Sequence, residues 1–167
     1  TQRSKWLPQR FLGAFVLWVT GWKVEGVFPD IPKMMAIFAP HTSNWDFCIA
    51  LMMKWKLGVK GTYLGKHTIF KPPFGWFFRV TGGLPVHRAA RHDMVRQVVS
   101  YYDERAVCQI GIAPEGTRAY LPYWRSGFYH IARAANAPMV LVAFDFEHRR
   151  IIIGEPWDLS GDMGADM

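Results

Sequence analysis

The alternation of apolar, strand-length runs with helix-length segments limits this chain to few folds. Strands are expected at residues 22–27, 34–39, 61–65, 84–86, 106–113, 138–145 and 149–154. Helices are expected at 45–56, 91–105 and 126–136, with a further short helix in the second half of residues 69–79. In the helix expected at 91–105, apolar side chains recur every three or four residues, as on one face of an amphipathic helix. Apolar strands that alternate with helices predict an α/β fold, in which a mixed, largely parallel central sheet is flanked by helices.

Length and charge narrow the class of protein. A chain of 167 residues is expected to form one domain, residues 1–167, with one core. Its 20 Lys and Arg against 13 Asp and Glu give a net charge of +7, which favours anionic partners such as phosphates, acidic lipid surfaces, acidic carrier proteins or nucleic acid. Cys48 and Cys108 lie in apolar runs without the spacing of metal ligands, so we expect two buried thiols and no metal site.

The segment 1–22 contains an uncharged, aromatic run from Phe11 to Trp22, with three basic residues before it. The run is too short to span a bilayer, which takes ~20 apolar residues. Basic residues beside Trp and Phe suit a helix that lies in a membrane interface. A helix that packs over the sheet explains the same pattern, and the sequence leaves both alternatives open.

A histidine and an aspartate flank the turn between the strand expected at 34–39 and the helix expected at 45–56. Such a turn can fold His41 and Asp46 together, whereas residues five apart inside one helix diverge. A neutral imidazole takes a proton from a hydroxyl when a carboxylate fixes its tautomer and stabilises the imidazolium that forms. The simpler alternative is a turn histidine beside a capping aspartate. Ser43 is an alternative candidate for a catalytic role, as a covalent nucleophile. A role as the cap of the following helix accounts for a serine at this position.

The segment 114–118 supplies a second group of functional side chains. Gly116 permits a close backbone approach, while Thr117 and Arg118 can donate to a phosphate or carboxylate. Glu115 could hold Arg118 or brace the loop. Since Lys66, Arg88 and Arg118 each follow an expected strand, they could converge into one basic pocket. A surface turn with a local ion pair is the alternative for the 114–118 segment alone.

Four segments together resemble the ordered motif blocks of the glycerolipid acyltransferases, and the 1-acylglycerol-3-phosphate acyltransferase branch is the most similar. The blocks are residues 41–46, 83–88, 114–118 and 137–140. The resemblance implies transfer of a fatty acyl group from acyl-CoA or acyl carrier protein to the free hydroxyl of a lysophospholipid, with no cofactor beyond the acyl donor.

The resemblance also assigns roles to particular residues. It implies that His41 is the general base and that Asp46 orients it. It further implies that Arg88, Gly116, Thr117 and Arg118 bind the phosphate of the acceptor and that Glu115 shapes that site, with Lys66 as a helper argued from its position. The fourth block, residues 137–140, is expected to be structural and to line the pocket near the acyl chain.

Substrates with long chains imply work at a membrane surface, and we expect a peripheral or monotopic protein on the cytoplasmic face. The segments 1–22 and 70–79 are the candidates for membrane contact, with core packing as the alternative for the second. The other functions left open are an acyl-thioester hydrolase, an acyltransferase for another lyso-lipid, and a module that binds lipid or nucleic acid without turnover. No nucleic-acid partner is expected, because the aromatic residues lie in apolar segments and no basic helix is present.

Overall fold

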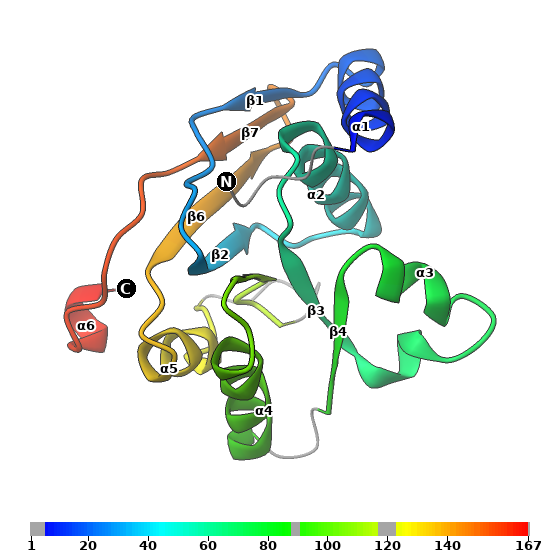
Figure 1. Cartoon of the computed structure of the whole chain (residues 1–167). Helices are drawn as coiled ribbons and strands as arrows, with labels where there is room; N and C mark the ends of the chain where they lie inside the picture. The colour runs from blue at the N-terminus through cyan, green and yellow to red at the C-terminus, as the bar shows by residue number, and fades with distance from the viewer. Residues whose placement is uncertain (1–5, 88–90, 117–122, 167) are drawn as a thin grey trace.

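The computed structural model describes residues 6–87, 91–116 and 123–166, and it is built around one seven-stranded sheet (Figure 1). The strands lie in the order β1-β7-β6-β2-β5-β3-β4. Every neighbouring pair is parallel except β6 and β7, which are antiparallel. The mixed, largely parallel sheet expected from the sequence is therefore confirmed. The strands are β1 (Lys23–Glu25), β2 (Lys33–Ala39), β3 (Thr62–Lys66), β4 (Gly83–Val86), β5 (Cys108–Ile112), β6 (Met139–Asp145) and β7 (Arg150–Ile153).

Helices cover both faces of this sheet. The helices α1 and α2 lie over one face, and α4 and α5 lie over the other (Figure 1). Two short elements escaped the sequence-based assignment, the 3₁₀ helix η1 and the C-terminal helix α6. The helices are α1 (Leu7–Val19), α2 (Asn44–Leu57), η1 (His67–Phe70), α3 (Gly75–Val80), α4 (Arg91–Asp103), α5 (Gly127–Ala134) and α6 (Met163–Asp166).

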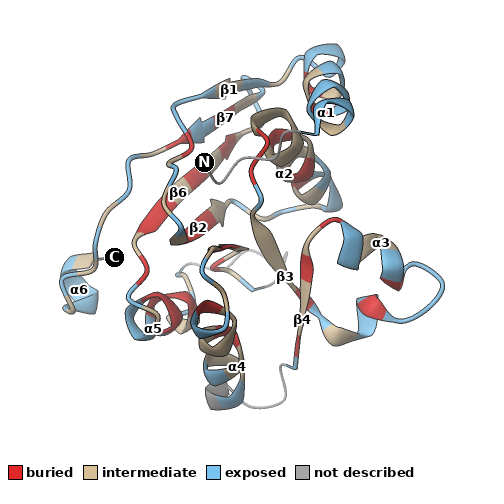
Figure 2. Cartoon of the chain, in the orientation of Figure 1, coloured by how far each residue is buried: buried red, intermediate tan, exposed pale blue. Residues whose placement is uncertain are grey.

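The central strand β2 is a continuous apolar run because both of its faces are covered. Met34 and Ala36 pack on the side of α1 and α2, whereas Met35 and Ile37 pack on the side of α4 and α5. Successive side chains of a strand point to opposite faces, so a strand covered on both sides is apolar throughout. Figure 2 shows this burial along β2 and β6, in contrast to the exposed outer surfaces of the helices.

The helix α1 packs against α2 and leaves its other face exposed. Gly13 permits the close approach, since a β-carbon there would lie 2.5 Å from the backbone oxygen of Met52. Leu17 is buried on the same side, while large apolar side chains such as Phe11 and Trp18 remain exposed. The packing alternative therefore holds for one face of the helix, and membrane contact by the other face stays a prediction. No helix in the described ranges is long and apolar enough to cross a membrane.

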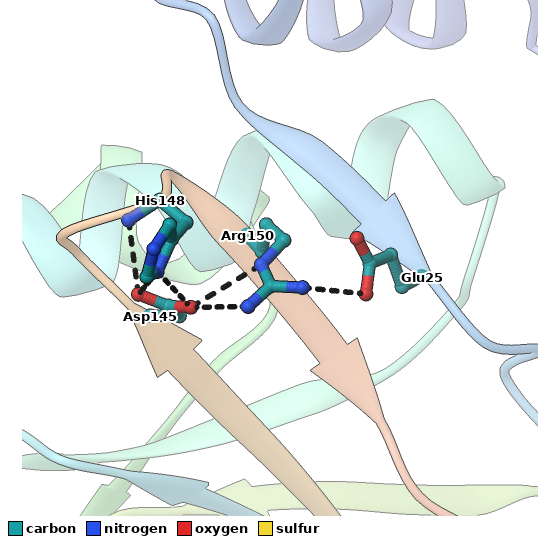
Figure 3. Close-up of polar contacts among 4 residues, drawn as sticks. All are labelled: Glu25, Asp145, His148 and Arg150. Carbon is teal, nitrogen blue, oxygen red and sulfur yellow. Dashed lines mark hydrogen bonds and ion pairs between the residues drawn. The ribbon is translucent and has the colours of Figure 1, made fainter.

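Charged side chains tie the strands β1, β6 and β7 together at one end of the sheet (Figure 3). Arg150 donates to Asp145 at 2.8 Å and reaches Glu25 at 3.6 Å, and the ring of His148 lies 3.0 Å from Asp145. The backbone N–H of His148 and the Arg150 guanidinium lower the pKa of Asp145 to about 2. This carboxylate therefore stabilises the native turn above its unfolded-state pKa near ~4, and the contribution is lost as the pH falls through about 2.

The expectation of two buried thiols is wrong for one of them. Cys108 is buried on β5, but Cys48 is exposed near the start of α2. The reason is that α2 is apolar around most of its circumference, with α1, the sheet and a cavity on different sides. The apolar run that contains Cys48 thus did not indicate which of its side chains are covered.

Candidate active site

The turn between β2 and α2 brings His41 and Asp46 together. β2 ends at Ala39, and α2 begins at Asn44 with Ser43 as its N-cap. The Ser43 side chain accepts the N–H of Trp45 at 3.0 Å, and the Asp46 side chain in turn accepts the N–H of Ser43 at 2.8 Å. This reciprocal pair is a capping box, which fixes both the start of the helix and the position of the carboxylate.

The imidazole of His41 lies directly beside this carboxylate. Its Nδ1 atom is 3.3 Å from Oδ2 of Asp46, which is 2% exposed, whereas the His41 side chain is 28% exposed. A carboxylate oxygen beside Nδ1 favours the tautomer of the neutral ring that carries its proton on Nδ1. In that tautomer the lone pair is on Nε2, and this nitrogen can accept a proton.

Ser43 is fully occupied as part of the cap. Its hydroxyl donates to Oδ1 of Asp46 at 2.9 Å and accepts the backbone N–H of Trp45. A serine nucleophile would instead direct its hydroxyl at the imidazole. The local geometry therefore favours the cap over the nucleophile.

Glu115 approaches the same turn from the loop that follows β5. Both of its carboxylate oxygens accept the backbone N–H of His41, at 3.0 and 3.2 Å. The contact is possible because β2 and β5 are parallel neighbours, whose carboxyl ends meet at one edge of the sheet. The sequence pointed to Glu115 but gave no signal that its partner is the backbone of residue 41.

The backbone N–H groups of this turn all donate hydrogen bonds to the carboxylates of Asp46 and Glu115. His41 donates to Glu115, while Thr42 and Ser43 donate to Asp46 at 2.6 and 2.8 Å. In the following loop, the Gly116 N–H donates to the Ala113 carbonyl. The amides of residues 41–43 thus hold the His41 turn, and the Gly116 amide is used within its own loop. A transient oxyanion would need donors from other groups.

A cavity of about 1920 Å³ opens beside the His41–Asp46 pair. Lys66 and Gly116 also line it, so the structure brings four residues expected at the site to one cavity. Aromatic and aliphatic side chains form much of its wall, among them Phe38, Phe47, Leu51, Met53, Phe77 and Phe78. The walls are thus suited to an apolar chain, and the His41 imidazole lies at one part of them.

Three expected site residues, Arg88, Thr117 and Arg118, lie outside the described residues. The fourth block does not line the cavity as expected. Ala137, Met139 and Val140 are instead packed in the two halves of the core, because β6 is a central strand covered on both faces. Across residues 6–87, 91–116 and 123–166, no three His, Cys, Asp or Glu side chains are arranged to hold a metal ion. That no cofactor is needed stays a prediction.

Comparison with known proteins places this chain and its fold among the acyltransferases. Residues 29–145 match the family model described as Acyltransferase, and the chain belongs to that family. Among solved structures, it is similar to the crystal structure of the 1-acyl-sn-glycerophosphate (LPA) acyltransferase PlsC from Thermotoga maritima. The TM-score is 0.66 at 18% sequence identity, over 93% of this chain and 70% of that one. No curated protein matches the chain by sequence.

Proposed function

We propose that this acyltransferase moves a fatty acyl group from acyl-CoA or acyl carrier protein to the free hydroxyl of a lysophospholipid, with 1-acylglycerol-3-phosphate as the leading acceptor. The observation that carries the proposal is a His41–Asp46 pair at the wall of a large, mostly apolar cavity. The similarity to a 1-acyl-sn-glycerophosphate acyltransferase, together with the residues of the four sequence blocks, supports this choice of acceptor.

The proposed reaction needs one base and no covalent enzyme intermediate. Nε2 of His41 takes the proton of the acceptor hydroxyl while the hydroxyl oxygen attacks the thioester carbonyl. The carbon–sulfur bond then breaks, and the imidazolium returns the proton to the leaving thiolate. Asp46 holds the ring in the right tautomer and stabilises its positive charge. A positioned base of this kind contributes roughly 10²–10⁴ in rate.

The acceptor phosphate is proposed to lie near Lys66, an exposed cation at the end of β3 that lines the cavity. Gly116 also lines this cavity, in the loop after β5, the parallel neighbour of β3. The other proposed phosphate ligands, Arg88, Thr117 and Arg118, follow from the sequence blocks alone. Arginine and the backbone of a glycine-containing loop are common ligands for phosphate oxygens.

The proposal is tested by following loss of an acyl thioester with and without the lysophospholipid. Transfer predicts little thioester loss without the acceptor and formation of the diacyl product with it. Equal thioester loss in both reactions, with release of free fatty acid, would instead identify a hydrolase. Turnover of a different lyso-lipid in preference to 1-acylglycerol-3-phosphate would keep the reaction and change the acceptor.

We propose that Glu115 positions His41 through the backbone N–H of that residue. The same side chain is also proposed to shape the acceptor site. Replacing Glu115 by alanine removes the acceptor for the His41 N–H, and we expect kcat to fall roughly 10–100-fold, the range for losing a hydrogen bond to a charged group. Glu115→Gln keeps one oxygen acceptor and should restore most of the activity.

The control for Glu115 is Glu147→Ala, which removes an exposed carboxylate in the turn between β6 and β7. It should leave kcat and KM at their normal values. If Glu115→Ala raises KM without changing kcat, Glu115 acts through the acceptor and has no role in placing the base.

The exposed face of α1 is proposed to contact an anionic membrane surface. Phe11 is 74% and Trp18 is 76% exposed, and Phe15 lies between them with rings 6.3 Å from each. The net charge of +7 adds attraction to acidic headgroups. Replacing Phe11 and Trp18 by serine should weaken binding to vesicles of phosphatidylglycerol and phosphatidylcholine by about tenfold or more for each side chain.

The matched control replaces Val27 and Met163, two exposed apolar residues outside α1, by serine. Co-sedimentation with the vesicles should be unchanged in that variant. Equal loss of binding in both variants would mean that α1 is not the contact surface, and unchanged binding in both would assign the contact to another part of the chain.

A further inference from the structure

The short helix α3 has an inner side that lines the large cavity and an outer side that nothing in the described part of the chain covers. Phe77 and Phe78 line the cavity. Phe74, Trp76 and Val80 are 69%, 66% and 73% exposed (Figure 2). Trp76 and Val80 are four residues apart, so they lie on the same side of the helix, and Phe74 is its N-cap residue. These three exposed residues form the α3 patch.

Contacts at both ends of α3 hold the helix in this orientation. A β-carbon on Gly75 would overlap the backbone oxygen of Phe70, so the helix begins in close contact with the preceding turn. At the other end, the Tyr63 hydroxyl donates to the Phe78 carbonyl at 3.1 Å, and the Lys54 ammonium donates to the carbonyl of the C-cap residue. The α3 patch is therefore held on the outside of the molecule.

The α3 patch is a neighbour of α1, whose exposed face is proposed above to contact a membrane. A small pocket of about 150 Å³ is lined by Arg10 of α1 and Val80 of α3, together with Lys54 and Lys60. Val80 belongs to the α3 patch, and Arg10 is followed in α1 by the exposed Phe11. The exposed apolar residues of the two helices therefore continue into each other across this pocket.

The charges on these two segments have one sign. No Asp or Glu occurs in residues 1–24, which hold four Lys and Arg, or in residues 47–92, which hold eight. The pocket between α1 and α3 is lined by the cations Arg10, Lys54 and Lys60 and by no acid. None of the ion pairs formed among the described residues includes these three. Acidic headgroups attract such cations, and Trp and Phe suit the membrane interface beneath them.

We propose that the α3 patch enters the same anionic lipid bilayer as the exposed face of α1, and that the cationic pocket between the two helices lies at the phosphate headgroups. α3 then forms a wall between the bilayer and the large cavity, because its inner side lines that cavity. The continuity with α1 favours a bilayer over an acidic protein as the partner. This inference rests on the proposed function, because it extends the membrane contact proposed there for α1.

Co-sedimentation with vesicles of phosphatidylglycerol and phosphatidylcholine is the first test. Replacing all three residues of the α3 patch by serine should weaken binding by about tenfold or more for each aromatic side chain removed. Thermal unfolding should be nearly unchanged, because only exposed side chains are altered. The variant of Val27 and Met163 described above is again the matched control and should bind normally. Unchanged binding of the α3 variant overturns the inference, even if the α1 variant binds weakly and the α1 contact therefore stands.

Fluorescence quenching tests the contact of Trp76 with lipid directly. Brominated acyl chains quench a tryptophan that touches them, so the quenching that is lost in Trp76→Phe comes from this side chain. The variant keeps an aromatic ring and should bind vesicles nearly as well as the wild-type protein, but with less quenching. Trp157→Phe, which changes a partly buried tryptophan packed on the α4 and α5 side of the sheet, should leave the quenching unchanged. Equal quenching in the wild-type protein and Trp76→Phe would place Trp76 outside the bilayer and overturn the inference.

Activity without vesicles separates this inference from the proposed function. With a short-chain, water-soluble acyl-CoA and lysophospholipid, the α3 variant should be as active as the wild-type protein. If no transfer is detected for either protein but the α3 variant binds vesicles weakly, the proposed function fails and the inference stands. Normal vesicle binding by the α3 variant, combined with lost binding to acyl carrier protein, would identify an acidic protein as the partner and overturn the inference.

Discussion

Replacing His41 by glutamine should lower kcat for acyl transfer by roughly 10²–10⁴, the contribution of a positioned general base. Glutamine has a similar reach but cannot accept the acceptor proton near neutral pH. The fold should be retained, because the His41 side chain is part-exposed and its N–H bond to Glu115 involves only the backbone. The measurement is the rate of diacyl product formation at saturating donor and acceptor, with thermal unfolding as the check on folding.

His148 offers a matched control for this variant. Like His41, it has Nδ1 near an aspartate oxygen, at 3.0 Å from Asp145, but it lies at the turn between β6 and β7 and does not line the cavity (Figure 3). His148→Gln should therefore leave kcat at its normal value. If His41→Gln retains near-normal turnover, the base is a different group, and the role proposed for the His41–Asp46 pair is wrong.

The sequence predicted the centre of the sheet because its central strands are buried on both faces. β2 and β6 are continuous apolar runs, and their observed limits differ from the expected ones by one residue at a single end. The antiparallel pairing of β7 with β6 is indicated by the length of the connection between them. Only residues 146–149 separate β6 from β7, too few for the crossover that a parallel pair requires. The position of β1 beside β7 depends on contacts between distant segments, which periodicity does not report.

The same distinction between local and distant contacts applies to the site. His41, Ser43 and Asp46 lie within one turn, so their spacing and the helix start predicted that they could meet. The bond from His41 to Glu115 joins residues 74 positions apart. It depends on β2 and β5 being neighbours, an order that the sequence did not establish. The exposed outer side of α3 likewise became visible only once burial was known.

Replacing Asp46 by asparagine separates the charge of this residue from its role in the cap. The amide oxygen of asparagine can still accept the N–H groups of Thr42 and Ser43, and its NH₂ group can donate to the Ser43 hydroxyl. The turn therefore keeps its shape but loses the negative charge beside the imidazole. We expect kcat to fall by about 10²-fold or more, because the imidazolium that forms as the base takes its proton is no longer stabilised. Unfolding free energy should fall by about 1 kcal/mol, the net worth of a weakened hydrogen bond.

Ser43→Ala is the variant that completes this test, because it damages the cap without touching the charge. It removes the side-chain acceptor for the Trp45 N–H and the donor to Asp46, so it should cost about 1 kcal/mol of stability, similar to the cost of Asp46→Asn. Its effect on kcat should be far smaller, since Asp46 keeps its contact with His41. A loss of activity in Ser43→Ala equal to that in Asp46→Asn would mean that the cap itself, or the serine hydroxyl, limits the reaction. Two variants of similar stability and very different kcat would instead identify the negative charge of Asp46 as the property that the chemistry uses.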